Sequence, residues 1–128
     1  MIATKDIEQI LIGDLSSLMD ISRIYTGDDA PEGVVSSERI VIRTKQLKTQ
    51  TIFSKCFVEV NWCVPDLWDN PDSPRLQTVE RQMADLESVG EYDGSAYRYG
   101  VDSIQTLGSE LKCHYVNVRL LFEILNVK

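Results

Sequence analysis

A strict two-residue alternation of apolar and polar side chains runs through two long stretches of the chain. In residues 52–64 one face is apolar, and only Ser54 interrupts it. Residues 111–127 repeat the pattern. Because successive side chains of a strand point to opposite faces, each stretch predicts a long, half-buried strand. The apolar sets are Ile52, Cys56, Val58, Val60, Trp62 and Val64 in the first stretch, and Val116, Val118, Leu120, Phe122 and Ile124 in the second.

Two helices follow from apolar residues that recur every three or four positions. Residues 4–19 predict an amphipathic helix with Thr4 as its N-cap. Ser73 can cap a second helix that has Pro74 at its first position, and Gly90 ends it. We expect the polar stretch between Gly90 and Tyr97 to be a loop.

The remaining patterns predict shorter strands. Ile24 and Tyr25 indicate a short one. Residues 38–44 are rich in β-branched side chains and predict a strand antiparallel to residues 52–64. Residues 97–107 predict another, with Gly108 and Ser109 as a turn before the last strand.

This order of elements predicts the fold class. Strands grouped in runs, with only two helices, favour an α+β fold: an antiparallel β-sheet with a long hairpin, flanked by two main helices on one face. The length of 128 residues suits one domain, and we see no repeat or boundary within residues 1–128.

Composition narrows the classes of function. The net charge of −7 disfavours nucleic-acid binding through bulk electrostatics. The N-terminus lacks the basic start of a signal peptide, and no apolar run reaches the ~18 residues that cross a bilayer. We therefore expect a protein that is kept in a cytoplasm and binds no membrane.

No pattern indicates catalysis. The chain has three cysteines, Cys56, Cys63 and Cys113. Because their number is odd and they form no CxxC motif, we expect buried free thiols. His114 is the single histidine and should point to the opposite face from Cys113. The acidic loop with Asp66, Asp69 and Asp72 lacks the spacing of a calcium loop. We expect no catalytic residue, metal or cofactor.

Charge is unevenly distributed along the predicted hairpin. Its tip, from Arg39 to Lys55, has no acidic residue, and its base, from Glu59 to Asp72, has no basic one. Solvated charges that protect strand edges would explain this, and so would an arm that docks on an acidic patch of a neighbouring subunit. Trp62 is most simply core, whereas Trp68 suits either an interface or loop packing. The candidate interface residues are Arg43, Lys45, Lys48, Asp66, Trp68 and Asp69.

The whole pattern resembles the small tail-completion and head–tail joining proteins of long-tailed bacteriophages and prophages, which include tail terminators. The features that carry the resemblance follow one another along nearly the whole chain. They are the amphipathic helix Ile7–Leu18, Ile24-Tyr25 leading to Ala30-Pro31, the strand at Ile40-Val41-Ile42, the long strand Phe57–Trp62, the helix Leu76–Val89 and the closing strands that end in Val116–Leu125. The acidic insert Asp66–Asp72 and the connection Lys45–Thr51 are departures from the pattern.

The resemblance implies an assembly role without catalytic residues or a cofactor. It implies a subunit that forms a ring, commonly a hexamer, at the end of the tail tube or between the head connector and the tail. Its partners would be copies of itself and other virion proteins, and it would pass from the bacterial cytoplasm into the virion. Two alternatives stay open: a small acidic module, inhibitor-like or immunity-like, that masks a basic partner, and an enzyme with a deep pocket.

Overall fold

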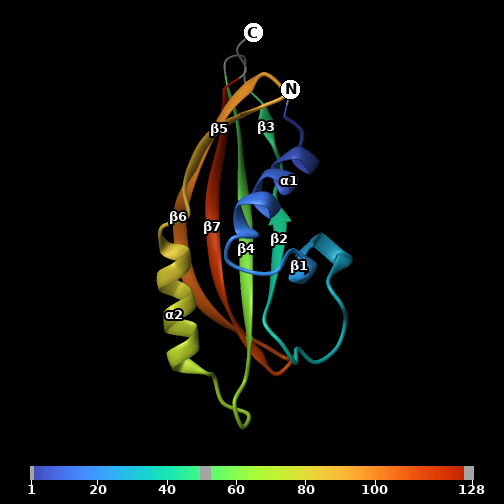
Figure 1. Cartoon of the computed structure of the whole chain (residues 1–128), viewed down its shortest axis with the longest axis vertical. Coiled ribbons are helices and arrows are strands. Elements are labelled where there is room, and N and C mark those ends of the chain that lie inside the picture. Colours follow the sequence, from blue (N-terminus) through green and yellow to red (C-terminus); the bar gives the residue numbers. More distant parts are fainter. Residues whose placement is uncertain (1, 50–52, 126–128) are drawn as a thin grey trace.

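The computed structural model describes residues 2–49 and 53–125. Among these residues the chain forms two α-helices and one seven-stranded sheet (Figure 1), which confirms the α+β class. The helices are α1 (Thr4–Leu15) and α2 (Ser73–Ala84). The strands are β1 (Ile24–Thr26), β2 (Arg39–Thr44), β3 (Lys48–Thr49), β4 (Phe53–Pro65), β5 (Ser88–Tyr92), β6 (Ser95–Ser109) and β7 (Cys113–Leu125).

The sheet is mixed rather than purely antiparallel. Its order is β1-β2-β4-β7-β6-β5, and β3 pairs with β4. Every pair is antiparallel except β1 with β2, so the prediction of an antiparallel sheet was wrong at this edge. A parallel pair needs a crossover of about a dozen residues, and residues 27–38 supply that length.

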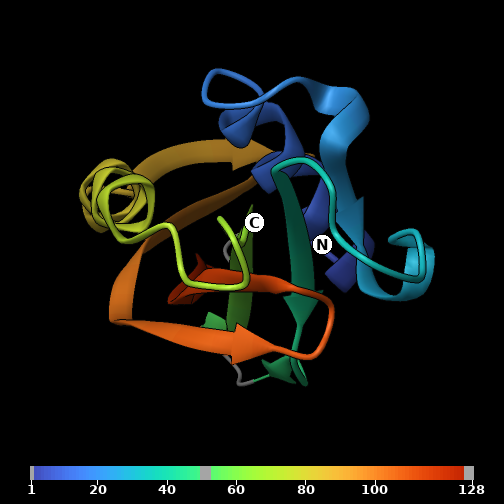
Figure 2. The same ribbon diagram turned by 90° about the horizontal axis from the view of Figure 1, so that it is seen from below.

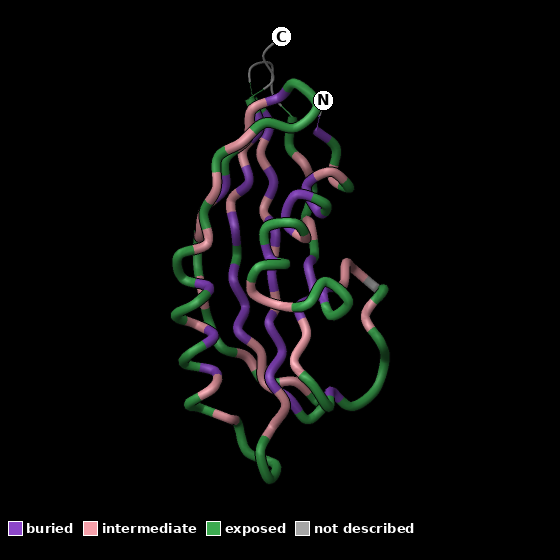
Figure 3. Tube along the Cα trace, viewed as in Figure 1, coloured by how far each residue is buried: buried purple, intermediate pink, exposed green. Residues whose placement is uncertain are grey.

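The two alternating stretches form long strands, as predicted, and these strands lie at the centre of the sheet. β4 and β7 pair along their whole length, from Phe53 opposite Leu125 to Pro65 opposite Cys113. Buried positions alternate along both strands (Figure 3), and Ser54, the one polar member of the apolar face of β4, is buried too. The ends of these predictions at residues 52, 126 and 127 lie outside the described residues.

Both helices contribute to one buried cluster on the inner face of the curled sheet (Figure 2). Trp62 lies in this cluster, as expected. None of the described helices has the length and apolar character needed to cross a bilayer. The largest fully buried members are Ile2 before α1, Ile7, Leu11 and Leu15 of α1, Met83 of α2, and Ile40, Ile42, Val58, Trp62, Leu120, Phe122 and Ile124 of the sheet.

The first helix is shorter than predicted. It ends at Leu15, four residues before the predicted end, and its N-cap is Ala3 rather than Thr4. The side chain of Asp6 accepts the Ala3 N–H at 2.8 Å, which satisfies a free backbone donor at the start of the helix. At the other end the Ser16 hydroxyl donates to the Gly13 carbonyl at 2.6 Å, and such local bonds compete with the helix.

The second helix also ends early, at Ala84 instead of Gly90, and its N-cap is Asp72 instead of Ser73. Gly90 lies in β5, so the predicted loop up to Tyr97 is a hairpin of β5 and β6. Its turn is Asp93-Gly94, and both residues have positive φ (49° and 78°), the conformation of a two-residue hairpin turn.

The predicted turn at Gly108 and Ser109 was also wrong. Both residues pair within the β6–β7 ladder, and the reversal comes after them, at residues 110–112. Lys112 there has a φ of 57°.

Candidate functional site

The predicted interface residues are spread along β4, with Arg43 beside the middle of the strand. Lys48 is in β3, which pairs with the first residues of β4. Asp66, Trp68 and Asp69 lie in the loop after Pro65, where β4 ends. A strand of 13 residues spans roughly 40 Å. The structure therefore separates Lys48 from the acidic groups by almost the length of the sheet (Figure 1).

We call residues 66–72 the Trp68 turn. Leu67 and Asn70 exchange backbone hydrogen bonds at 2.8 and 2.9 Å, and Trp68 and Asp69 between them have positive φ (53° and 63°). The Asn70 side-chain amide donates to the Trp68 carbonyl at 3.1 Å. This closed turn holds the Trp68 side chain 93% exposed, so the alternative that Trp68 packs within its loop does not describe this structure.

Two carboxylates of the Trp68 turn, those of Asp66 and Asp69, differ in burial and in the distance to their partners. Asp66 Oδ1 lies 2.7 Å from His114 Nδ1, and the Asp66 side chain is largely buried. Asp69 is far more exposed, and its carboxylate lies 4.0 Å from the Lys112 ammonium. Asp69 is therefore the more accessible of these two predicted interface residues.

The basic residues lie on or beside the outer face of the sheet, opposite the helices. Arg43 is exposed and stands opposite Glu59, which stands opposite Arg119 in β7. Lys45 follows β2, and its ammonium lies 3.3 Å from the Glu59 carboxylate. Lys48 is exposed in β3, opposite Lys55. In the connection that holds Lys45 and Lys48, residues 50–52 lie outside the described residues.

The outer face carries polar contacts between neighbouring strands. The Asn117 amide donates to Asn61 Oδ1 at 2.6 Å, and the Arg119 guanidinium lies 4.0 Å from the centre of the Phe57 ring. Such cross-strand pairs stabilise the sheet and also leave a patterned surface of donors, acceptors and charges.

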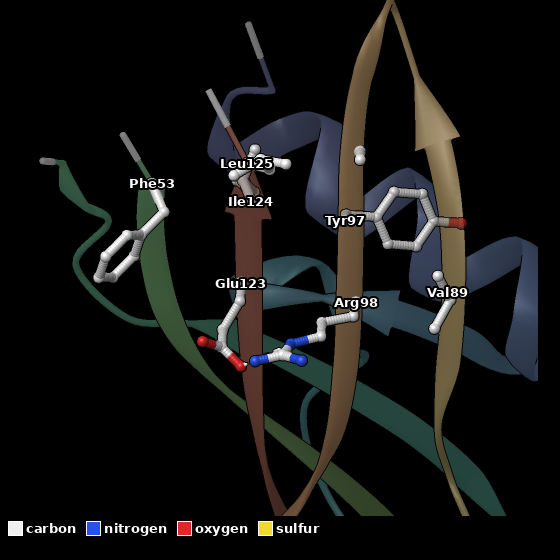
Figure 4. A pocket seen from close by; sticks show the side chains of 8 residues that line it. Phe53, Val89, Tyr97, Arg98, Glu123, Ile124 and Leu125 are labelled. Atoms are coloured by element: carbon white, nitrogen blue, oxygen red, sulfur yellow. Dashed lines mark hydrogen bonds and ion pairs between the residues drawn. The ribbon is translucent and has the colours of Figure 1, made fainter. Parts of the chain in front are cut away.

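An apolar pocket that the sequence did not predict lies at the β3 end of the sheet, where β4 begins. We call it the Val89 pocket. It measures about 560 Å³, and side chains of four strands line it (Figure 4). Sequence reasoning missed it because Val89 continues the helical spacing of residues 76–86. The lining residues are Phe53, Val89, Ala96, Tyr97, Arg98, Glu123, Ile124 and Leu125.

The three thiols are buried and free, as predicted. Cys63 and Cys113 pack with Val35, whose loop covers this end of the outer face. Burial, together with the neighbouring Cys113, raises the pKa of the Cys63 thiol to about 11. The His114 ring contacts the Asp66 carboxylate, at 2.7 Å. Within residues 2–49 and 53–125 no group of three His, Cys, Asp or Glu side chains could hold a metal ion.

Comparison with known proteins adds information on the fold alone. No family model matches the chain, and no curated protein matches it. A solved structure whose name states neither an activity nor a partner is similar, with a TM-score of 0.59 and 13% sequence identity. The similarity covers 95% of this chain and 92% of the other. At this identity the likeness concerns the arrangement of elements.

Proposed function

We propose that this chain is a structural assembly subunit of the phage tail-completion or head–tail joining type, which acts by binding copies of itself and other virion proteins. The observation that carries the proposal is the difference between the two ends of one long sheet. Lys45 and Lys48 lie toward the end where β4 begins, and the exposed Trp68 and Asp69 project from the other end. Because the two ends of the sheet differ, we expect one end of each copy to contact the opposite end of the next copy.

Such head-to-tail contacts have a defined consequence for assembly. They bury a different surface on each partner and repeat until the rotation between neighbours closes a ring. A hexamer is the ring size that the resemblance implies. In this proposal the long hairpin of β2 and β4, with the two helices beside it, supplies the arm that docks on the neighbour. The subunit would assemble in the bacterial cytoplasm and remain in the virion.

The test is the oligomeric state across a wide concentration range. We expect size-exclusion chromatography with light scattering to show growth from one subunit to a single fixed multiple between micromolar and millimolar concentration, since association follows mass action. Electron microscopy of the largest species should show closed rings.

A second candidate function is a small acidic module that masks a basic partner. The net charge of −7 and the exposed carboxylate of Asp69 favour it. This candidate predicts a stable monomer. A protein that stays monomeric at every concentration and forms no rings would contradict the assembly proposal and favour the acidic module.

A further inference from the structure

An exposed indole and an apolar pocket lie at opposite ends of the sheet. Trp68 is 93% exposed on a turn closed by backbone hydrogen bonds, and Leu67 beside it is exposed as well. An aromatic side chain of this size buries about 150–250 Å² when it is covered. Because the turn already fixes the backbone around Trp68, covering the indole costs little further conformational entropy.

The Val89 pocket has the chemistry to take such a side chain. Leu125 stands opposite both Phe53 and Ala96 in the sheet, so these three side chains share the outer face. Val89, in the edge strand β5, is 83% exposed and stands opposite Arg98. The volume of about 560 Å³ lies within the range of sites that bind small molecules and exceeds what one indole fills, which leaves room for Leu67.

Two basic side chains at the pocket can pair with the acidic group of the turn. Arg98 lines the pocket and is largely exposed, with its guanidinium 3.1 Å from the Glu123 carboxylate (Figure 4). Lys55 stands opposite Glu123 on the same face. The exposed carboxylate of Asp69 follows Trp68 directly, so an inserted turn would bring an acidic group beside Arg98 and Lys55, on a rim that also carries the carboxylates of Glu123 and Glu91.

Within one molecule the indole cannot reach the pocket. Phe53 begins β4 and lines the pocket, while Pro65 ends β4 just before the Trp68 turn. The strand between them spans roughly 40 Å. An indole that fills the pocket must therefore come from another molecule, and a second copy of this chain presents one.

We infer that the Trp68 turn of one copy inserts into the Val89 pocket of the next copy. The inference rests on the proposed function and specifies its interface. Each copy has one turn and one pocket, so the contact is heterologous and can propagate around a ring. Trp68 would be the central anchor, since buried Trp side chains carry much of the binding energy at protein interfaces.

Two variants and two matched controls test this contact by sedimentation velocity. Trp68→Ala removes the anchor, and Val89→Asp places a charge in the pocket. We expect each variant to weaken self-association by at least about tenfold. Ile21→Ala and Val34→Asp change exposed apolar side chains outside both surfaces (59% and 63% exposed), and we expect wild-type association for both. Circular dichroism checks that all four variants fold.

Mixing the two variants gives the sharpest result. Trp68→Ala keeps an intact pocket, and Val89→Asp keeps an intact turn. We expect each variant alone to associate only weakly, and an equimolar mixture to form pairs that stop at two subunits. Only a heterologous contact between these two surfaces predicts that pattern.

Amide and indole NMR signals report on the site directly. As concentration rises, the indole N–H of Trp68 and the amide of Val89 should shift, whereas the buried indole of Trp62, bonded to Glu38 at 2.9 Å, should not. If wild-type association persists unchanged in both variants, the inference is overturned and the proposed assembly role stands. If the wild type never associates, both are overturned.

Discussion

Glu38 joins three parts of the fold through one carboxylate. The Arg75 guanidinium of α2 donates to both of its oxygens, at 2.7 and 2.8 Å, and the Trp62 indole of β4 donates at 2.9 Å. Arg75 also lies over the Trp62 ring, 5.8 Å from its centre. These bonds hold the pKa of Glu38 below its ordinary value of 4.5, with the bond from Arg75 as the largest cause.

Glu38→Gln should lower the free energy of unfolding by roughly 1–2 kcal/mol at neutral pH, because an amide cannot accept the paired bonds of the guanidinium. Since the folded state depresses the pKa of Glu38, the stabilisation is complete above pH 4.5 and is lost as the pH falls below that value. Urea denaturation of the wild type and of Glu38→Gln should show that the gap between their free energies of unfolding closes as the pH falls. Glu32→Gln, at an exposed carboxylate, is the control. A gap that does not depend on pH would contradict this assignment.

The buried thiols should be unreactive in the folded protein. The thiolate is the reactive form, and burial raises the pKa of Cys56, Cys63 and Cys113. We expect Ellman's reagent at mildly alkaline pH to titrate no thiol until guanidinium unfolds the chain, when all three react. A Ser17→Cys variant, at an exposed position, should react at once. A native thiol that matches its rate would show that the cysteines are accessible.

At the scale of elements, the segment that forms the hairpin of β5 and β6 carries two conflicting sequence signals, a helical spacing and a turn dipeptide. Leu86 and Val89 extend the helical spacing of α2, and this spacing led to the wrong prediction of a helix that ends at Gly90. Leu86 does pack on the core, but Val89 is exposed on a strand. The dipeptide Asp93-Gly94 is a strong hairpin signal and would have identified the turn.

Two glycine substitutions should act in opposite directions. Gly94→Ala should destabilise the protein by about 1 kcal/mol, because Gly94 has a φ of 78° and a Cβ is strained there even though space is open. Gly13→Ala should stabilise it by about 0.5 kcal/mol, because Gly13 lies in α1 with nothing near a new Cβ. Thermal unfolding of both variants measures the difference. Equal effects at the two positions would contradict this account of the turn.

At the scale of the whole molecule, the two ends of the sheet carry different side chains. The basic residues Lys45 and Lys48 and the pocket lie toward one end, and the acidic Trp68 turn lies at the other. In the proposed contact between copies, charge would contribute to register and encounter rate, and the indole of Trp68 would contribute most of the affinity.

Self-association should therefore weaken, without disappearing, as salt rises. At 0.1 M salt exposed charges are screened beyond about 10 Å, so raising the salt to about 0.5 M should remove most of the charge contribution. Trp68→Ala should still associate more weakly than wild type at high salt, because salt does not screen the burial of apolar surface. Sedimentation velocity in a salt series measures both effects. Association that is insensitive to salt would exclude the charged residues from the contact.

The sequence by itself determined the central strands, the buried thiols and the core position of Trp62, because a two-residue period places a side chain on one face whatever its neighbours are. The tertiary structure alone decided the parallel edge strand, the pairing of Asp66 with His114, the joining of Glu38 to Arg75, and the pocket beside Val89. Each of these unites residues far apart in the chain. Their proximity depends on which strands share a common core, and local periodicity does not encode that choice.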